Sequence, residues 1–259
     1  MPAYRSNKIG TAIEIVQKIR NWPEALGLRI FKGADRLSLL AFRDGFNIVV
    51  RGGTRDWDVV HELFFAKGYQ KAMQWLAARP DPAPKILDLG GNIGSFTLLA
   101  YRNKPGARIT AFEPGPPNIA LFQMNMLANR LPEDRIELRK MAVAGTTGTA
   151  TWFFDSANPG GSSLYEKKGE PVDVQIVALA QVIEEAGEDI ALLKIDIEGS
   201  EYDLLAHTPA SVWERVHAIA LELHDDPAGK KTQQSFMEEM KAFGYQIEQE
   251  SVVSYFLHR

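Results

Sequence analysis

Apolar and polar positions follow two alternating patterns along the chain from residue 85 onward. Short apolar segments typical of buried strands are followed by segments whose apolar positions recur every three to four residues, as in a helix. The predicted strands are 85–90, 107–113, 135–143, 191–197, 217–224, 246–251 and 252–259, and the predicted helices are 94–102, 116–130, 179–187, 200–208 and 232–245. This order predicts an α/β fold with a doubly wound, mostly parallel sheet. The two consecutive strands at the end predict an antiparallel last strand.

Before residue 81 the pattern is different. It predicts a helix over 8–20, a hairpin of strands 36–42 and 46–52, a helix over 59–68 that Asp56 caps and Gly68 ends, and a helix over 69–79. The segment 79–84 holds three prolines in six residues and cannot continue a helix. We therefore divide the chain into an N-terminal helix, hairpin and lid-like extension, 1–80, and a larger α/β domain, 81–259. Within the latter, the alternating residues of 148–155 predict part of a surface hairpin.

The composition excludes several kinds of chemistry. Apolar residues make up 45% and charged residues 24% of the 259 positions, a balance usual for a globular protein. The chain has no cysteine, so disulfides, thiolate catalysis and zinc–thiolate sites are excluded. The formal charge is −4 without a dense Lys/Arg block, so we expect no nucleic-acid partner. Without a membrane-spanning apolar run or a signal peptide, we expect a soluble, cytoplasmic protein.

A glycine-rich turn follows the first strand of the predicted sheet. In KILDLGGNIGSFT (85–97) the strand reaches Asp88, Gly90 and Gly91 allow the backbone to approach a ligand, and Gly94 begins a helix. Dinucleotide folds present such a helix N-terminus to a pyrophosphate, which a carboxylate just before the turn would repel. The same carboxylate suits a sulfonium ligand with an ammonium tail. The turn therefore favours S-adenosylmethionine over NAD.

The next segments supply the rest of a cofactor site. Glu113 ends the second strand, where a carboxylate can accept hydrogen bonds from both ribose hydroxyls. Asn118 lies in the first turn of the following helix, and Met141 and Ala142 come near the expected adenine. These features predict a class I, Rossmann-like methyltransferase domain. The predicted cofactor-binding residues are Asp88, Gly90, Gly91, Asn92, Gly94, Phe96, Glu113, Pro114, Asn118, Met141 and Ala142.

Several separated motifs resemble those of a known family. They are LDLGGNIGSFT (87–97), AFEPGPPN (111–118), LLKIDIEGSEYDLL (192–205) and LELH (221–224), together with the upstream block 42–69. With these residues the chain resembles the FkbM family of methyltransferases over most of its length. The resemblance implies S-adenosylmethionine as cofactor and O-methylation of a hydroxyl on a sugar, glycoconjugate or natural product. Gly91 stands where alanine is more usual in the family, which is a conservative departure.

Charged residues gather at the ends of the fourth and fifth predicted strands. Lys194, Asp196 and Glu198 share one face by the two-residue period of a strand, and Glu201 follows on the next helix. Glu222 and His224 end the fifth strand on a common face. Because ligands bind beyond the carboxyl ends of strands in an open α/β sheet, we expect these groups to converge beside the methyl group. The predicted catalytic residues are His224, Asp196, Glu198 and Lys194.

These residues leave several roles open. An unperturbed histidine titrates near pH ~6.5, so a neutral His224 is the first candidate for the general base. Asp196 is the competing candidate, as base or as the group that orients the acceptor. A divalent metal held by Asp196, Glu198 and His224, with magnesium the natural ion, is a further alternative, although we do not expect one. Lys194 and Asp196 could instead form a structural ion pair, and Glu198 could chiefly shape the turn with Gly199.

Two further segments are candidates for contacts with the acceptor or the cofactor. The segment 155–169 is rich in turn formers and hydroxyls, and its Ser162, Ser163 and Tyr165 are predicted acceptor contacts. In the N-terminal extension, Arg51, Asp56 and Tyr69 are predicted to cover the cofactor. Arg51 and Asp56 could equally pin the hairpin to the domain.

Other functional classes stay open from the sequence. An NAD(P)-dependent oxidoreductase also uses a glycine turn and an acid on the second strand, although the acid before the turn disfavours it. A subunit that binds S-adenosylmethionine without catalysis is a non-enzymatic alternative. The absence of a basic face disfavours a nucleic-acid methyltransferase.

Overall fold

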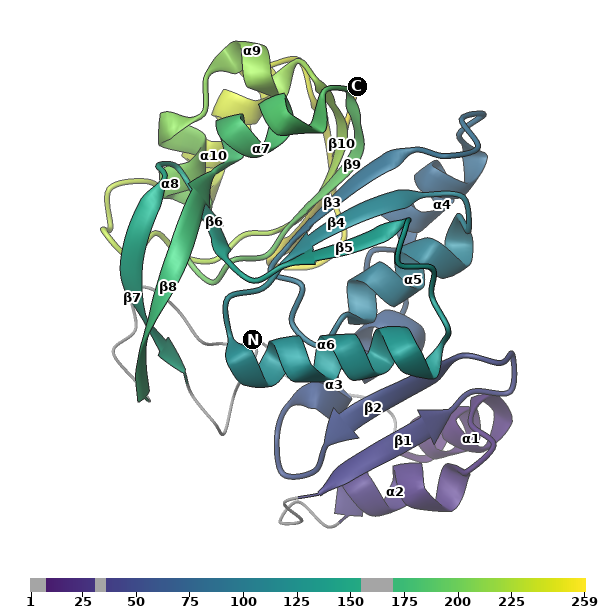
Figure 1. The fold of residues 1–259 in the computed structure, drawn as a ribbon. Helices are drawn as coiled ribbons and strands as arrows, with labels where there is room; N and C mark the ends of the chain where they lie inside the picture. The colour runs from purple at the N-terminus through teal and green to yellow at the C-terminus, as the bar shows by residue number, and fades with distance from the viewer. Residues whose placement is uncertain (1–7, 31–35, 155–169) are drawn as a thin grey trace.

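The computed structural model describes residues 8–30, 36–154 and 170–259 (Figure 1). The predicted acceptor contacts Ser162, Ser163 and Tyr165 lie outside the described residues. The helices are α1 Lys8–Lys18, α2 Trp22–Ile30, α3 Asp56–Phe64, α4 Gln70–Ala78, α5 Ser95–Asn103, α6 Pro116–Ala128, α7 Leu179–Ala186, α8 Glu201–His207, α9 Ala210–Trp213 and α10 Gln233–Ala242. The strands are β1 Leu37–Ala41, β2 Asn47–Arg51, β3 Lys85–Leu89, β4 Arg108–Phe112, β5 Ile136–Arg139, β6 Ala142–Ala144, β7 Gly148–Phe154, β8 Glu170–Ala178, β9 Ile190–Ile195, β10 Val216–Glu222, β11 Gln246–Gln249 and β12 Ser254–His258.

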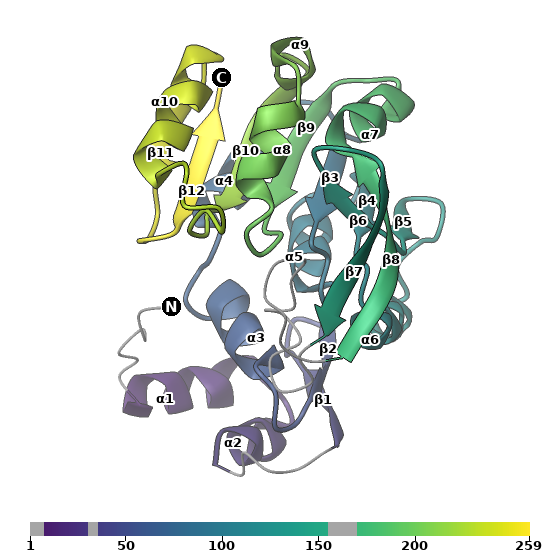
Figure 2. The ribbon, with the colours of Figure 1, turned by 90° about the vertical axis from the view of Figure 1, so that its left-hand side faces the viewer.

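Seven of the described strands form one central sheet in the order β11-β12-β10-β9-β3-β4-β5. The strands from β10 to β5 in that order are parallel, whereas β12 pairs antiparallel with both β10 and β11. Figure 2 shows β11, β12 and α10 at one edge of the molecule. The predicted doubly wound α/β sheet with an antiparallel last strand is confirmed. The chain order reverses between β3 and β9, and ligands bind at such a reversal in open α/β sheets.

Helices cover both faces of this sheet because neighbouring residues of a strand point to opposite sides. On β3, Ile86 packs in the core that contains α4 and α5, while Leu87 packs in the core that contains α7, α8 and α10. On β10, Ala218 and Ala220 belong to the first core, and their small side chains allow α4 to approach the sheet. Figure 1 shows these two groups of helices on opposite sides of the sheet.

The predicted N-terminal hairpin is confirmed as the antiparallel pair β1–β2, which lies beside α6. The side-chain amide of Asn125 accepts a hydrogen bond from Val49 N (2.6 Å) and donates to Val49 O (3.3 Å). Asn129 makes the same two contacts with Asn47, at 2.8 and 2.7 Å. One amide from α6 and one from the residue after it thus satisfy backbone groups on the free edge of β2.

One hydrophobic core joins the two parts of the chain on either side of the proline-rich segment. It contains Ile15 of α1 and Val50 of β2 together with Ile109 of β4 and Phe256 of β12. The helix α4, which precedes the prolines, also contacts β9 and β10 directly. The division into 1–80 and 81–259 stays a prediction.

The predicted strand over 135–143 is wrong, because the chain turns in its middle. Met141 N donates to Arg139 O (3.0 Å), and this turn ends β5 in the central sheet. The strand β6 then joins a separate three-stranded sheet in the order β6-β8-β7. In that sheet β7 pairs antiparallel with β8, as the hairpin predicted at 148–155 requires.

The predicted boundaries of the helix after the first hairpin are also wrong. Asp56 is the first residue of α3 and does not cap it, because its carboxylate accepts hydrogen bonds from the Arg51 guanidinium at 2.8 and 2.9 Å. The helix ends at Phe64, before Gly68 is reached. The chain passes through left-handed backbone at Lys67 (φ 61°) and Tyr69 (φ 58°) before α4 begins.

Candidate functional site

The glycine turn after β3 packs closely against other parts of the protein, in addition to facing the expected ligand. Gly90 has φ 80°, and a Cβ there would lie 1.9 Å from the carbonyl oxygen of Asp196. A Cβ on Gly91 would lie 3.1 Å from the Phe122 ring. The turn therefore needs glycine at position 90 because the end of β9 lies directly against it.

Two buried ionic groups lie beneath this turn. Asp88 is fully buried and accepts a hydrogen bond from Thr97 Oγ1 at 2.7 Å. Lys194 Nζ donates to Leu89 O (3.2 Å) and Gly90 O (2.7 Å), and it lies 3.6 Å from Asp88 and 3.3 Å from Asp196. The ion pair between Lys194 and Asp196, one of the alternatives left open by the sequence, is present. Lys194 thus joins β9 to the glycine turn.

Glu113, at the end of β4, is almost fully buried and already holds several donors. Its Oε2 accepts from Asn92 N at 2.8 Å, and its Oε1 accepts from Gly115 N at 2.8 Å and Asn118 Nδ2 at 3.2 Å. Burial raises the pKa of Glu113, and these three hydrogen bonds oppose that rise. A carboxylate has about four acceptor positions, so Oε2 retains capacity for a ribose hydroxyl.

The N-terminal extension reaches this site through Arg51. Its guanidinium donates to Asn118 Oδ1 at 2.9 Å, while Asp56 holds the guanidinium from the other side. Asn118 in turn donates to Glu113. Arg51 and Asp56 therefore tie the hairpin to the domain, and they do so at the predicted cofactor site.

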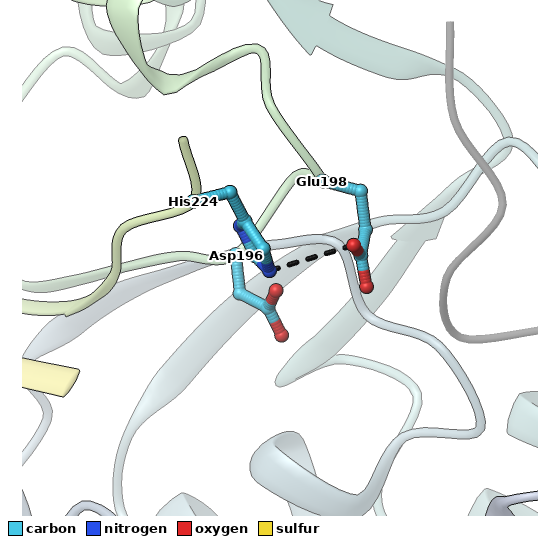
Figure 3. A group of neighbouring side chains, drawn as sticks. All are labelled: Asp196, Glu198 and His224. Carbon is cyan, nitrogen blue, oxygen red and sulfur yellow. Dashed lines mark ion pairs between the residues drawn. The ribbon is translucent and has the colours of Figure 1, made fainter. Parts of the chain in front are cut away.

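A second set of charged groups meets at the ends of β9 and β10. Figure 3 shows Asp196, Glu198 and His224 pointing toward one another. His224 Nε2 lies 3.4 Å from Glu198 Oε2 and 4.0 Å from Glu222 Oε1. On the other side of the ring, Nδ1 lies 3.0 Å from Glu201 Oε1. The predicted convergence of these acids and the imidazole is therefore present.

Glu201 fixes the orientation of this histidine. Its side chain is fully buried, and its carboxylate accepts hydrogen bonds from Ile197 N (3.1 Å) and Gly199 N (3.0 Å). Glu198, between these two residues, has φ 51°, so the chain turns sharply after β9. Glu198 thus shapes the turn, as one interpretation proposed, and its side chain also joins the acidic cluster.

The expectation of an unperturbed, neutral His224 is wrong. Burial lowers its pKa, but the hydrogen bond to Glu201 and the charges of Asp196, Glu201 and Glu198 outweigh burial and raise the pKa to about 10. Burial and the Asp196 charge raise the pKa of Glu198 to about 7. Burial and the same charge raise the pKa of Glu222 to about 8. The cluster is therefore crowded with negative charge.

The N-terminal extension also borders this cluster. Burial raises the pKa of Tyr69 well above its usual value, and the charges of Asp196, Glu222 and Glu62 raise it further. Burial, followed by the charge of Asp196, raises the pKa of Glu62. The ring of Tyr69 meets Phe96 edge-on, with the centroids 5.3 Å apart. Glu62 was missed by sequence analysis, because one acid in an amphipathic helix looks like a solvated residue.

A pocket connects the Glu113 site with the acidic cluster. Its lining residues are Gly90, Asn92, Phe112, Glu113, Pro114, Asn118, Ala142, Val143, Trp152, Asp196, Ile197, Glu198 and Ser200. Of the predicted cofactor residues, Asp88, Gly91, Gly94, Phe96 and Met141 are not among them. Met141 instead borders a second hollow, together with Arg139 and Gln181.

Trp152 on β7 is a pocket residue that the sequence did not reveal. It is nearly buried, and a Cβ on Gly115 would lie 2.8 Å from its ring. The pairing of β7 with β8 therefore places an aromatic ring against Gly115, the residue before α6. A single tryptophan in a strand with alternating polar and apolar residues does not show whether the side chain lines a ligand pocket or packs within the hairpin.

Comparison with known proteins identifies the family. Residues 88–247 match the model of the methyltransferase FkbM domain. The chain belongs to the FkbM methyltransferase family. Membership agrees with the glycine turn and strand-end acids, and it decides against the NAD(P)-dependent oxidoreductase.

Three related methyltransferases each match about half of the chain or more. It is 27% identical to methyltransferase 1 of Beauveria bassiana over 229 residues, 79% of this chain and 88% of the relative. It is 29% identical to 31-O-demethyl-FK506 methyltransferase FkbM of Streptomyces tacrolimicus, covering 56% of this chain and 66% of the relative. It is also 29% identical to 2-O-methyltransferase NoeI of Sinorhizobium fredii, over 51% of this chain and 59% of that protein.

A solved FkbM structure has the same fold. The methyltransferase FkbM from Methylobacillus flagellatus aligns with a TM-score of 0.50 at 15% identity, over 70% of this chain. The alignment spans 44% of that solved chain. Among the described residues, no helix is long and apolar enough to cross a membrane.

The pocket fits S-adenosylmethionine, the cofactor that FkbM membership implies. Glu113 offers an acceptor for the ribose, and Phe112, Val143 and Trp152 offer apolar surface for the adenine. Asp196 and Glu198, which also line the pocket, suit a positively charged sulfonium. The chemistry of the lining therefore matches a cofactor that is apolar at one end and cationic at the other.

Proposed function

We propose that this FkbM methyltransferase transfers a methyl group from S-adenosylmethionine to a hydroxyl of a sugar, glycoconjugate or natural product. The observation that carries the proposal is the cluster of Asp196, Glu198 and His224 beside the cofactor pocket. Methylation of an alcohol needs a group that orients the hydroxyl and receives its proton, and this cluster can do both. The names of two relatives, which describe O-methyl transfer, support the same chemistry.

The reaction is an in-line displacement. The acceptor oxygen forms a bond to the methyl carbon while the carbon–sulfur bond breaks, and S-adenosylhomocysteine leaves. The protein must hold the two reacting atoms in near-attack geometry. Of the residues that line the pocket, Glu113 and Trp152 would hold the adenosine, and Asp196 would face the acceptor. The proposed proton acceptor is Asp196. His224, whose pKa is raised to about 10, is protonated near neutral pH and would orient the acceptor hydroxyl instead.

We further propose that the extension over residues 1–80 forms one wall of the acceptor site. Glu62 and Tyr69 come from this part of the chain, and their pKa values respond to the charge of Asp196. Hydroxyl-rich acceptors suit such a wall, because carboxylates and a phenol can each bond a hydroxyl group.

The proposal can be tested by following a labelled methyl group. The full chain is incubated with S-adenosylmethionine carrying a carbon-13 methyl and with panels of sugars, polyketide alcohols and matched amines. We expect S-adenosylhomocysteine to form with hydroxylated acceptors and the label to appear as an O-methyl signal by NMR. Transfer to the amines alone, yielding N-methyl signals, would refute the proposal.

A further inference from the structure

We propose that Asp196, Glu198 and His224 bind one divalent cation at the carboxyl ends of β9 and β10. One ligand atom from each residue lies within 4.8 Å of the others. Ligands on opposite sides of a single ion lie about 4–5 Å apart, given bonds of about 2.0–2.6 Å. The three ligand atoms therefore already lie within the span of a single ion's coordination shell.

His224 is already oriented as a ligand. Its Nδ1 donates to the buried carboxylate of Glu201, so Nε2 is the nitrogen that faces Glu198 and Glu222. Metal-binding histidines are commonly held by such a carboxylate on the second ring nitrogen. Glu201 is itself fixed by two backbone N–H groups and cannot easily turn away. The imidazole thus presents Nε2 to the cluster.

Glu222 provides an independent reason for a cation. Its side chain is 9% exposed, and its Oε1 lies 4.0 Å from His224 Nε2, which is too far for a hydrogen bond. A polar group that is buried without a close partner is costly, and a cation near Glu222 would provide one. Glu222 Oε1 lies beside the same histidine nitrogen that would bind the ion.

Acidic side chains outnumber basic ones around the cluster. Besides Glu198, the acids of the described residues that interact with one another here are Glu62, Asp88, Asp196, Glu201 and Glu222, and the bases are Lys194 and His224. These acidic surroundings favour a bound cation.

The donor set indicates which ion to use as a probe. Carboxylate oxygens suit Mg²⁺ and Mn²⁺, and an imidazole nitrogen favours a transition metal over Mg²⁺. Mn²⁺ satisfies both preferences. Because Asp196 and Glu198 also line the cofactor pocket, an acceptor hydroxyl could complete the shell of the ion and become more acidic. This last role rests on the proposed function.

Binding can be measured without an acceptor. The full chain is treated with EDTA, freed of chelator and titrated with MnCl₂, and unbound Mn²⁺ is followed by its EPR signal. We expect one saturable site per chain. His224→Ala and Asp196→Asn should each weaken it by about 10–100-fold or more, the usual effect of disturbing a metal shell.

His258 provides a matched control. Like His224 it is 23% exposed and lies beside a glutamate, with Nε2 3.2 Å from Glu248 Oε1. His258→Ala should leave Mn²⁺ binding unchanged. Absence of saturable binding, or equal losses in His224→Ala and His258→Ala, would overturn the proposal.

Two further measurements distinguish a failure of the metal site from a failure of the proposed function. Calorimetry with S-adenosylhomocysteine reports the cofactor site and the folding of each variant, and Glu198→Gln replaces any variant that does not fold. Cofactor binding without Mn²⁺ binding would refute the metal site alone. If Mn²⁺ binds but labelled methyl goes to amines, the metal site stands and O-methylation fails.

Discussion

At the scale of single residues, Glu113 has two roles, to bind the ribose and to hold neighbouring groups of the protein. The sequence alone cannot separate them. Its position at the end of the second strand predicts contact with a ribose. The structure adds three donors, Asn92 N, Gly115 N and Asn118 Nδ2, which its carboxylate also holds in place. The acid therefore organises the pocket wall before any cofactor arrives.

Replacing Glu113 should affect both affinity and stability. Glu113→Ala removes a charged acceptor, so S-adenosylhomocysteine should bind about 10–150-fold more weakly, corresponding to about 1.5–3 kcal/mol. The free energy of unfolding should also fall, by about 1–3 kcal/mol, because buried N–H groups lose their acceptor. Calorimetry and urea unfolding measure the two effects. Glu137→Ala, at an exposed acid of the neighbouring strand β5, should not change affinity. Equal affinities in the two variants would remove the ribose role.

Trp152 is expected to contribute apolar contact to the adenosine. Trp152→Leu should weaken binding of S-adenosylhomocysteine by about 3–10-fold, the usual worth of an aromatic stacking contact. Trp22→Leu, at a partly exposed tryptophan of α2, is the control and should bind normally. The quenching of tryptophan fluorescence by the ligand should also disappear in Trp152→Leu alone. Full quenching in that variant would show that Trp152 does not contact the ligand.

At the scale of elements, the site depends on how closely β3 and β9 end beside each other. The glycine motif was recognisable from sequence, but the sequence explained only part of why glycine is needed there. Gly90 was expected to make room for a ligand, whereas its missing Cβ also makes room for the carbonyl group of Asp196. No sequence pattern reports a contact between two chain segments about a hundred residues apart.

This packing gives a sharp comparison between two glycines. Gly90→Ala would drive a Cβ against the Asp196 backbone and should abolish cofactor binding and greatly destabilise the fold. Gly187→Ala has a similar positive φ of 67° but open space around the new Cβ. It should cost only the left-handed backbone strain, about 1–2 kcal/mol, with cofactor affinity intact. Thermal unfolding and calorimetry measure both. Similar losses of stability in the two variants would contradict the close contact.

At the scale of the whole molecule, the sheet was predictable because its signal is repeated. Each strand carries the same apolar pattern, and each helix that follows reinforces the parallel arrangement. The split of 135–143 was not predictable, since the turn at Met141 depends on which sheet each half can join. Likewise, the elevated pKa of His224 arises from acids in the loop after β9 and at the start of α8, which only the fold brings close to the histidine.

The acceptor site was only partly predictable for a related reason. Residues at strand ends converge in any sheet of this topology, so Asp196 and His224 could be paired from sequence. Glu62 and Tyr69 come from the extension before the sheet, where no topological rule fixes their position. Glu201 was assigned only to a following helix, and the structure shows it orienting His224.

The central claim is that methyl transfer takes place at the cluster of Asp196, Glu198 and His224. The most direct test measures kcat and the Kd for S-adenosylhomocysteine in parallel for the parent chain, His224→Ala, Asp196→Asn and the control His258→Ala. We predict that kcat falls by about 10²–10⁴-fold in the two cluster variants, while the cofactor Kd of His224→Ala and both constants of His258→Ala stay close to the parent values. Undiminished kcat in both His224→Ala and Asp196→Asn would contradict the claim.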